Sequence, residues 1–424
     1  MRATNDKILL KRYPIKLIVI FLLCIQFFYT TVSASEATIY ELGIGENVYS
    51  FDEILRDYQS FSTTYQLNSI TYQLQALDGT IAMENYNSIQ NQYSETSTHL
   101  ASLKEAKENL LLYKENTTDA EVIAEIDTQI NTINSQIDQY NKTINSTNQN
   151  MTQAKLQEDI AAYYNIYHSE ILLEARNKLK NEFKKKCFNL IVLKEKQDYY
   201  QSYNKYLELI FTIENIKYKK GLSGITDLDL AKTNLMNNDL EISKNQIAYD
   251  TSYAFIKSEA NLKDNARINF PLSIEKKNYN TEQITKNFIS NNSSILQLHN
   301  FVRSYNSYLT NCTGLSYYEA SLKIDHYNLQ DKELRENIKA FVQHAILSYE
   351  QSFQSLNAAS EELQLKVKQL NITNIKKEHK MATELDLRKI EYEKDAAEAN
   401  YYQLCYNIVI WQDILDNNLY NVTP

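Results

Sequence analysis

The sequence contains few of the residues that turns require. It has 6 glycines and 3 prolines in 424 residues, and Pro271 is the one proline between Pro14 and the C-terminal Pro424. Sheets and barrels need frequent turns, and turns draw on glycine and proline. The sequence therefore predicts an all-α protein of long antiparallel helices, with little or no β-structure.

The motifs of common catalytic and cofactor sites are also absent from the sequence. It contains no G-x-x-x-x-G-K, no paired G-x-G-x-x-G, no H-E-x-x-H and no C-x-x-C, and its 6 histidines are scattered. A single histidine on a helix usually has a packing or surface role. We therefore expect no enzyme activity, no cofactor and no metal site.

The first 34 residues have the pattern of a secretory signal peptide. Four basic side chains (Lys7, Lys11, Arg12 and Lys16) precede an apolar run over 17–29, and the small residues Val32 and Ala34 follow. Cleavage after Ala34 is expected. The alternative is an uncleaved anchor, although the run is shorter than the ~20 residues of a spanning helix.

Removing residues 1–34 takes away five basic residues and one acidic residue, which changes the formal net charge from −9 to −13. An acidic, exported chain repels the phosphates of nucleic acid, so no nucleic-acid partner is expected. The cysteines that remain, Cys187, Cys312 and Cys405, are odd in number and far apart. They do not form the pattern of a disulfide framework.

The first half of the chain shows long helical periodicity. One helical pattern runs from about Tyr49 to Tyr113, with a disturbance expected at 78–79, and the next begins after an N-cap at Thr118 or Asp119. Apolar residues then recur at alternating steps of three and four: Ile123, Ile126, Ile130, Ile133, Ile137, Tyr140 and Ile144. This heptad spacing predicts a coiled-coil extension over about 95–150, in which the second helix folds back on Leu100, Leu103 and Leu110.

The remaining helical patterns fall into two similar halves. The helical pattern continues to about Tyr218, breaks over 219–225 and resumes from Thr226 to about Leu262. A polar linker is expected at 265–281. The second half shows helical patterns over 282–309, 317–375 and 383–415, with breaks between them.

A short motif occurs once in each half. Thr-Asp-Leu-Asp-Leu occupies 226–230 and Thr-Glu-Leu-Asp-Leu occupies 383–387, an offset of 157. Both threonines are predicted to be helix N-caps, and Gly221 and Gly224 permit the reversal before the first. The chain is thus interpreted as a duplication: a signal peptide (1–34), a first helical repeat (35–264), a linker (265–281) and a second repeat (282–424).

The stretch around the first motif resembles a known family. Residues 218–235, "YKKGLSGITDLDLAKTNL", resemble the first hairpin tip of the TolC-like outer membrane efflux proteins. The matching positions are Gly221, Leu222, Ile225, Thr226, Asp227, Leu228 and Ala231. "MATELDL" (381–387) resembles the second tip, in which Thr383 and Asp386 match. Lys380, Met381, Ala382 and Lys389 depart from the family pattern.

The resemblance, which covers about 36–418, implies an exported protein of the cell envelope. The family forms homotrimers that build a hollow helical barrel, whose tips close the entrance and bind a periplasmic adaptor of an inner-membrane pump. The resemblance assigns Gly221, Leu222, Thr226, Asp227, Thr383 and Asp386 to these tips. It implies an outer membrane efflux or secretion conduit, with membrane association through such partners.

The sequence departs from the family where the family carries two pairs of membrane-spanning strands. The corresponding places, "KENTTDA" (114–120) and "TNCTGLS" (310–316), have seven residues each. A membrane-spanning strand needs ~9–11 residues, so the helical plan is expected without these strands. The alternative function is therefore a cell-envelope scaffold or spacer that binds proteins and conducts nothing.

Overall fold

The chain forms long helices, as expected, and one small sheet that was not predicted. The computed structural model describes residues 39–43, 46–264, 266–271 and 274–424, and the predicted signal peptide lies outside these residues. In chain order the described elements are β1 (Ile39–Leu42), β2 (Asn47–Ser50), α2 (Phe51–Phe61), α3 (Thr63–Glu115), α4 (Ala120–Ile166), α5 (His168–Lys219), α6 (Ile225–Glu259), β3 (Ala266–Pro271), α7 (Thr281–Ser290), α8 (Ser293–Leu309), α9 (Leu315–Glu378) and α10 (Glu384–Asp416). The all-α prediction is confirmed.

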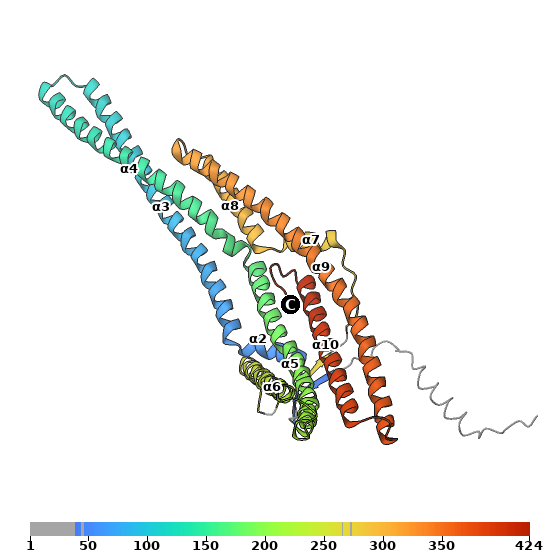
Figure 1. Cartoon of the computed structure of the whole chain (residues 1–424). Coiled ribbons are helices and arrows are strands. Elements are labelled where there is room, and N and C mark those ends of the chain that lie inside the picture. Colours follow the sequence, from blue (N-terminus) through green and yellow to red (C-terminus); the bar gives the residue numbers. More distant parts are fainter. Residues whose placement is uncertain (1–38, 44–45, 265, 272–273) are drawn as a thin grey trace, which may run out of the picture.

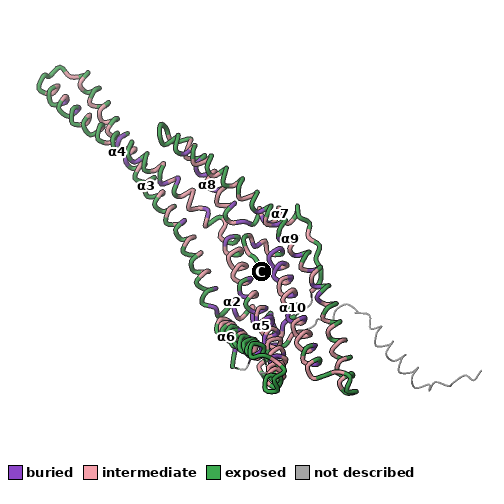
Figure 2. Tube along the Cα trace, viewed as in Figure 1, coloured by how far each residue is buried: buried purple, intermediate pink, exposed green. Residues whose placement is uncertain are grey.

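The helices pair as antiparallel hairpins, which gives the molecule an elongated shape. The α3–α4 hairpin ends at one extremity, and the turns between α5 and α6 and between α9 and α10 lie at the other (Figure 1). The α8–α9 hairpin points in the same direction as α3–α4 but ends short of it. Near these latter turns the helices pack in the order α6, α5, α10, α9. Buried residues concentrate in the middle of the molecule, whereas the hairpin ends are largely exposed (Figure 2).

The first helical pattern breaks at Ser62 and not at Gly79, where a disturbance was expected. The Ser62 hydroxyl accepts a hydrogen bond from the Tyr65 backbone N–H (3.2 Å) and so caps α3. Gly79 lies inside α3, where a Cβ atom would approach the Ala161 carbonyl oxygen of α4 to 2.9 Å. The glycine therefore permits close approach of two helices, and it does not interrupt α3.

The α3–α4 pair has the antiparallel arrangement predicted from the isoleucine spacing. Asp119 caps α4 by accepting a hydrogen bond from the Glu121 N–H (3.0 Å). Ile126, Ile130 and Leu100 are buried along the contact between the two helices. The other isoleucines of the heptad pattern are half-buried. Hydrophobic burial along this seam therefore holds the extension together.

Two further breaks were not predicted, at Tyr167 between α4 and α5 and at Asn291–Asn292 between α7 and α8. The breaks lie beside each other. The Tyr163 hydroxyl donates to the Ser293 carbonyl oxygen (2.6 Å), and the Ser293 N–H donates to Glu174 Oε2 (2.8 Å). The expected continuous helices across 167 and 291 are wrong. Side chains of the first half satisfy the Ser293 backbone after the second break, whereas no side chain caps α5 at Tyr167.

The segment expected to be a polar linker contains the central strand of a sheet with the order β1-β3-β2. Strand β3 pairs antiparallel with β1 and parallel with β2. Its side chains alternate, and Ala266, Ile268 and Phe270 are buried against α2, α5 and α6. The prediction missed β3 because its six residues are too few to show a period among polar neighbours.

A second apolar core lies among α7, α9 and α10. Its largest buried members are Phe288, Tyr349 and Trp411. No helix in the described part of the chain is both long and apolar enough to cross a membrane.

Candidate functional site: two helical hairpin tips

The six predicted site residues lie in two turns at one end of the molecule (Figure 1). Residues 217–227, here the first tip, join α5 to α6, and residues 376–386, the second tip, join α9 to α10. Gly221, Leu222, Thr226 and Asp227 belong to the first tip, and Thr383 and Asp386 belong to the second. The tips are neighbours because α5 packs on α10, but they are separate turns.

The first tip ends α5 with a closed turn. The Leu222 N–H donates to the Lys217 carbonyl (2.8 Å), and the Gly221 N–H donates to the Tyr218 carbonyl (2.9 Å). This pair of bonds requires one residue in the left-handed region, and Gly221 supplies it with φ +70°. Glycine adopts this conformation without steric cost.

The second tip ends α9 with the same two bonds. The Met381 N–H donates to the Lys376 carbonyl (2.7 Å), and the Lys380 N–H donates to the Lys377 carbonyl (2.9 Å). Here a lysine occupies the left-handed position, with φ +59°. The departure from glycine therefore changes the side chain of the turn, while its hydrogen bonds stay the same.

The helix that follows the first tip begins one residue earlier than predicted. Gly224 is the N-cap of α6, and Thr226 lies within the first helical turn. Asp227 Oδ2 accepts a hydrogen bond from the Gly224 N–H (3.2 Å). The prediction that Thr226 is the N-cap is wrong, because the aspartate three residues after Gly224 satisfies the backbone there.

The helix that follows the second tip begins as predicted, with Thr383 as the N-cap of α10. Its hydroxyl accepts from the Asp386 N–H (3.1 Å), and Asp386 Oδ2 accepts from the Thr383 N–H (2.8 Å). The hydroxyl and backbone N–H of Thr383 lower the pKa of Asp386. The carboxylate is thus an ionised capping group at neutral pH.

The two tips are equivalent at an offset of 159 residues, and not at the 157 that the sequence motif indicates. The left-handed residues are 221 and 380, the N-caps 224 and 383, and the capping aspartates 227 and 386. The Thr-x-Leu-Asp-Leu repeat is therefore out of register with the structural repeat by two residues. In the structural register Asp227 and Asp386 are counterparts, as are Leu222 and Met381.

An exposed apolar side chain follows the left-handed residue in each tip. Leu222 is 74% exposed and Met381 is 69% exposed. Sequence reasoning included Leu222 but treated Met381 as a departure from the family. Only the structural register reveals that the two side chains occupy the same position.

The tips differ in the chemistry that surrounds these apolar side chains. In the second tip Lys377 pairs with Glu384, and Arg388 Nε lies 2.9 Å from Glu384 Oε1. The lysine lowers the pKa of Glu384 most strongly, through its hydrogen bond. The first tip carries the exposed apolar residues Tyr218 and Ile225 at the positions of Lys377 and Glu384. At these two positions the first tip therefore presents apolar side chains, and the second presents an ion pair.

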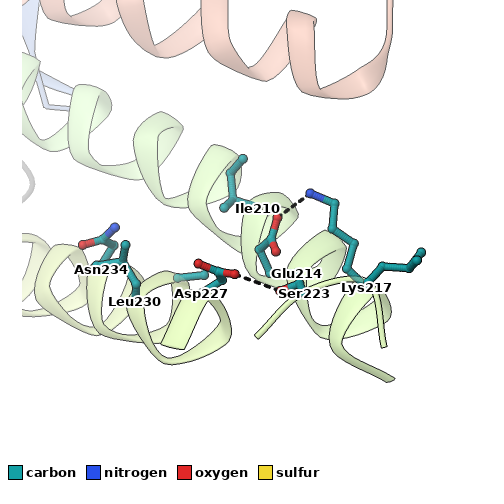
Figure 3. A pocket seen from close by; sticks show the side chains of 9 residues that line it. Ile210, Glu214, Lys217, Ser223, Asp227, Leu230 and Asn234 are labelled. Atoms are coloured by element: carbon teal, nitrogen blue, oxygen red, sulfur yellow. Dashed lines mark hydrogen bonds and ion pairs between the residues drawn. The ribbon is translucent and has the colours of Figure 1, made fainter. Parts of the chain in front are cut away.

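A groove of about 500 Å³ opens beside the first tip, between α5 and α6 (Figure 3). Its lining residues are Ile210, Glu214, Lys217, Leu222, Ser223, Asp227, Leu230, Ala231 and Asn234. Lys217 Nζ lies 2.6 Å from Glu214 Oε1 on the α5 side and lowers the pKa of Glu214. Apolar and charged groups share the groove, which suits contact with a peptide segment or helix of a partner.

Among the described residues, no three or more His, Cys, Asp or Glu side chains gather in a way that could hold a metal ion.

Several solved outer membrane proteins are similar to this chain. The outer membrane protein VceC of Vibrio cholerae is 11% identical, with a TM-score of 0.44, and the match covers 64% of this chain and 74% of VceC. The open-state MtrE outer membrane channel of Neisseria gonorrhoeae is 11% identical over 63% of this chain and 71% of its own, with a TM-score of 0.40. The CmeC outer membrane channel of Campylobacter jejuni is 11% identical, covers 66% and 67%, and has a TM-score of 0.40.

These proteins are of the class that the motif in the first tip resembles. No protein-family model matches the chain, and no curated protein matches it. The identities and TM-scores of these matches are low. The residues of the first and second tips are therefore the stronger evidence on function.

Proposed function

We propose that the chain is a component of an envelope efflux or secretion conduit of the TolC-like kind, and that its two tips bind a periplasmic adaptor of an inner-membrane pump. The observation that carries this proposal is the equivalence of Leu222 and Met381. Closing a helical turn requires backbone bonds and a capping group, but it does not require a large apolar side chain in water. Two such side chains, at equivalent positions and at the same end of the molecule, are typical of a surface that a partner covers.

The edges of the helical row support assembly with further copies of the chain. Helices α6 and α9 stand at the two edges of the row α6, α5, α10, α9. Exposed apolar side chains follow both edges: Met236, Leu240 and Ile247 on α6, and Leu365, Ile372 and Ile375 on α9. Contacts between unlike edges close into a ring when the rotation is a whole fraction of a turn. We propose a homotrimer, the number that the family resemblance implies.

In such a ring the capping aspartates face their symmetry mates around the entrance. Asp227 and Asp386 are both exposed in one copy of the chain. Rings of carboxylates attract cations, and like charges brought close together raise each other's pKa. The entrance of an assembled ring would therefore respond to acid differently from the single chain, in which hydrogen bonds lower the pKa of Asp386.

The proposed location is the cell envelope, reached by export through the predicted signal peptide. The rival function remains a non-conducting envelope scaffold. It uses the same hairpins for protein contacts but gives no reason for two equivalent tips at one end.

Replacing the two apolar side chains tests the conduit. In cells of the source organism that depend on this chain to expel a fluorescent dye, Leu222→Asp combined with Met381→Asp should abolish dye efflux. Leu112→Asp is the matched control, because Leu112 is also exposed but lies in a hairpin at the other end of the molecule. The control should export dye like the parent. Retained efflux in the double variant would contradict docking through the tips.

The mass of the purified protein in solution separates the conduit from the scaffold. Light scattering should give three times the chain mass for the parent and for both variants, because the substitutions lie outside the proposed contacts between copies. A stable monomer that forms no ring would favour the scaffold.

A further inference from the structure

A groove of about 550 Å³, here the α7–α9 groove, lies between α7 and α9 and away from the first and second tips. Its lining residues are Thr281, Glu282, Thr285, Lys286, Ile289, Arg335 and Lys339. Helix α7 lies near the middle of the molecule's length, beside the long helix α9 (Figure 1). Phe288 of α7 and Ile338 of α9, which adjoin lining residues in the sequence, are buried in the second apolar core. Two packed helices therefore form the walls of a groove that has the size of a small-molecule site.

The charge of the α7–α9 groove is opposite in sign to that of the whole chain. Three basic side chains line it, those of Lys286, Arg335 and Lys339, and Glu282 is the one acid among the lining residues. The chain without residues 1–34, in contrast, has a formal net charge of −13. Within the part of the chain that the structure describes, Lys286 and Lys339 form no ion pair. Both ammonium groups are therefore available to a negatively charged ligand.

Arg335 is held in position by two neighbouring side chains. Its Nε donates to Asp331 Oδ2 (2.7 Å), and its Nη2 lies 2.9 Å from His299 Nε2. Asp331 compensates the charge of Arg335, so the two lysines carry the uncompensated positive charge of the groove. A guanidinium that is already fixed loses little rotamer freedom when it binds a carboxylate. Arg335 thus adds a positioned donor one helical turn from Lys339.

Hydrocarbon groups form the walls between the charged heads. Ile289 and the methyl groups of Thr281 and Thr285 line the α7 side. The stems of Lys286 and Lys339 add further methylene groups, because long basic side chains cover apolar surface while their charged heads stay in water. A ligand that fills the groove therefore needs both a negative head and an apolar body.

We propose that the α7–α9 groove binds a small amphipathic anion, with its carboxylate head at Lys286 and Lys339 and its apolar body along Ile289. An inorganic anion would leave the hydrocarbon walls in water, and a neutral ligand would leave the ammonium groups without a partner. A stable protein interface takes about 20–30 residues from each side, whereas seven residues line this groove. The proposal does not depend on the first and second tips, which lie elsewhere in the molecule.

Fluorescence titration of the purified mature chain tests the two parts of the ligand separately. The probe is dansyl-undecanoate, a carboxylate on an apolar body, used below its micelle concentration. Its emission should rise and saturate as the groove fills. The methyl ester of the probe, which has no charge, should bind roughly tenfold more weakly. Decanoate should displace the probe at lower concentration than hexanoate does, because the longer chain buries more apolar surface. Inorganic phosphate at equal ionic strength should not displace it.

Two double variants locate the binding site. Lys286→Gln combined with Lys339→Gln removes the uncompensated charges of the groove and should weaken probe binding roughly tenfold, while the affinity for the methyl ester stays the same. Lys332→Gln combined with Lys368→Gln is the matched control, because it changes the net charge equally at two exposed lysines outside the groove. The control should bind the probe like the parent.

All four substituted side chains are exposed, so circular dichroism should show the same helix content in both double variants and the parent. Absence of saturable probe binding by the parent would overturn the proposal. Equal affinities for the probe and its methyl ester, or an equal loss of affinity in the two double variants, would do the same.

Discussion

The α5–α6 and α9–α10 hairpins close their tips with the same backbone bonds but hold their stems with different side chains. In the α6 stem two of the buried residues nearest the tip are asparagines, Asn238 and Asn245, and their amides donate to the carbonyls of Tyr200 and Leu193 on α5. In the α10 stem the buried residues nearest the tip are apolar: Leu387, Ile390, Ala397 and Ala399.

A helical hairpin must bury side chains between its two helices, and it must also hold the helices in one register; the two stems differ in the second requirement. Apolar packing tolerates a range of helix positions, whereas each asparagine bond specifies one carbonyl of the partner helix. The asparagines lie seven residues apart on α6 and bind carbonyls seven residues apart on α5. The first hairpin therefore has a fixed register along its stem, which an apolar stem specifies less strictly.

The largest effect is expected from the buried acid of the first hairpin, Glu195. Its Oε1 accepts from the Tyr40 hydroxyl (2.6 Å), and burial, with Glu398 and Asp198 nearby, raises its pKa from 4.5 to about 7. Between these values the folded chain keeps a proton that the unfolded chain has lost. Stability should therefore fall as the pH rises from 4.5 to 7.

Glu195→Gln removes this titration and keeps the acceptor for Tyr40. The parent should lose about 3 kcal/mol more than the variant between pH 4 and pH 8, as measured by urea denaturation. Parallel pH profiles for the two proteins would show that Glu195 does not titrate between these limits.

The asparagine bonds come next in size. Asn245 donates to the Leu193 carbonyl and to Gln197 Oε1, both at 2.8 Å. Asn245→Ala should lower the free energy of unfolding by about 2 kcal/mol, because it removes two buried hydrogen bonds and leaves Gln197 Oε1 without this donor. Asn237→Ala, at an exposed neighbour, should stay within about 0.5 kcal/mol of the parent. Equal stabilities of the two variants would remove the distinction between the stems.

The left-handed residues of the two tips should respond in opposite directions. Gly221→Ala places a side chain at φ +70° and should cost about 1 kcal/mol. Lys380→Gly relieves the corresponding strain and should leave stability unchanged or raise it by less than about 1 kcal/mol. Thermal denaturation of the two variants measures both signs. A stabilising Gly221→Ala would mean that the first tip does not adopt this turn.

The smallest effects are expected at the N-caps. Thr383→Ala should cost about 1 kcal/mol, because the Asp386 N–H loses its acceptor. Gly224→Thr should gain a few tenths of a kcal/mol, since a Cβ there meets only Asp227 Oδ2, at 3.8 Å. Hydrogen exchange of the first-turn amides resolves changes of this size. The same exchange rates in Thr383→Ala and the parent would argue against the cap.

The sequence predicted those features of the fold that depend on long runs of residues. The isoleucine spacing predicted the pairing of α3 with α4, and the scarcity of glycine and proline predicted the helices. Helix breaks that depend on contacts with distant parts of the chain could not be predicted from the sequence. Tyr167 and Asn291 carry no strong breaking signal, and the contact between Tyr163 and Ser293 joins positions 130 residues apart.

The repeated motif correctly indicated the positions of two turns between helices, but its alignment of the two turns was wrong. The Thr-x-Leu-Asp-Leu repeat marks both tips, yet an N-cap depends on where the chain reverses and not on the motif itself. Gly224 has no side chain to cap a helix, so the sequence favoured Thr226. The equivalence of Leu222 with Met381 follows only from the hydrogen bonds of the turns.

The sheet also determines the order in which the chain can assemble. Residue 42 pairs opposite residue 268, whereas α3 and α4 are consecutive helices joined by a short turn. Closing a long loop costs entropy that grows with its length, and non-local pairings form slowly. During synthesis β1 and β2 emerge early and remain unpaired until β3 follows them. The three short strands thus pair only after β3 has been synthesised, and amide protection should appear later in the sheet than in the α3–α4 hairpin.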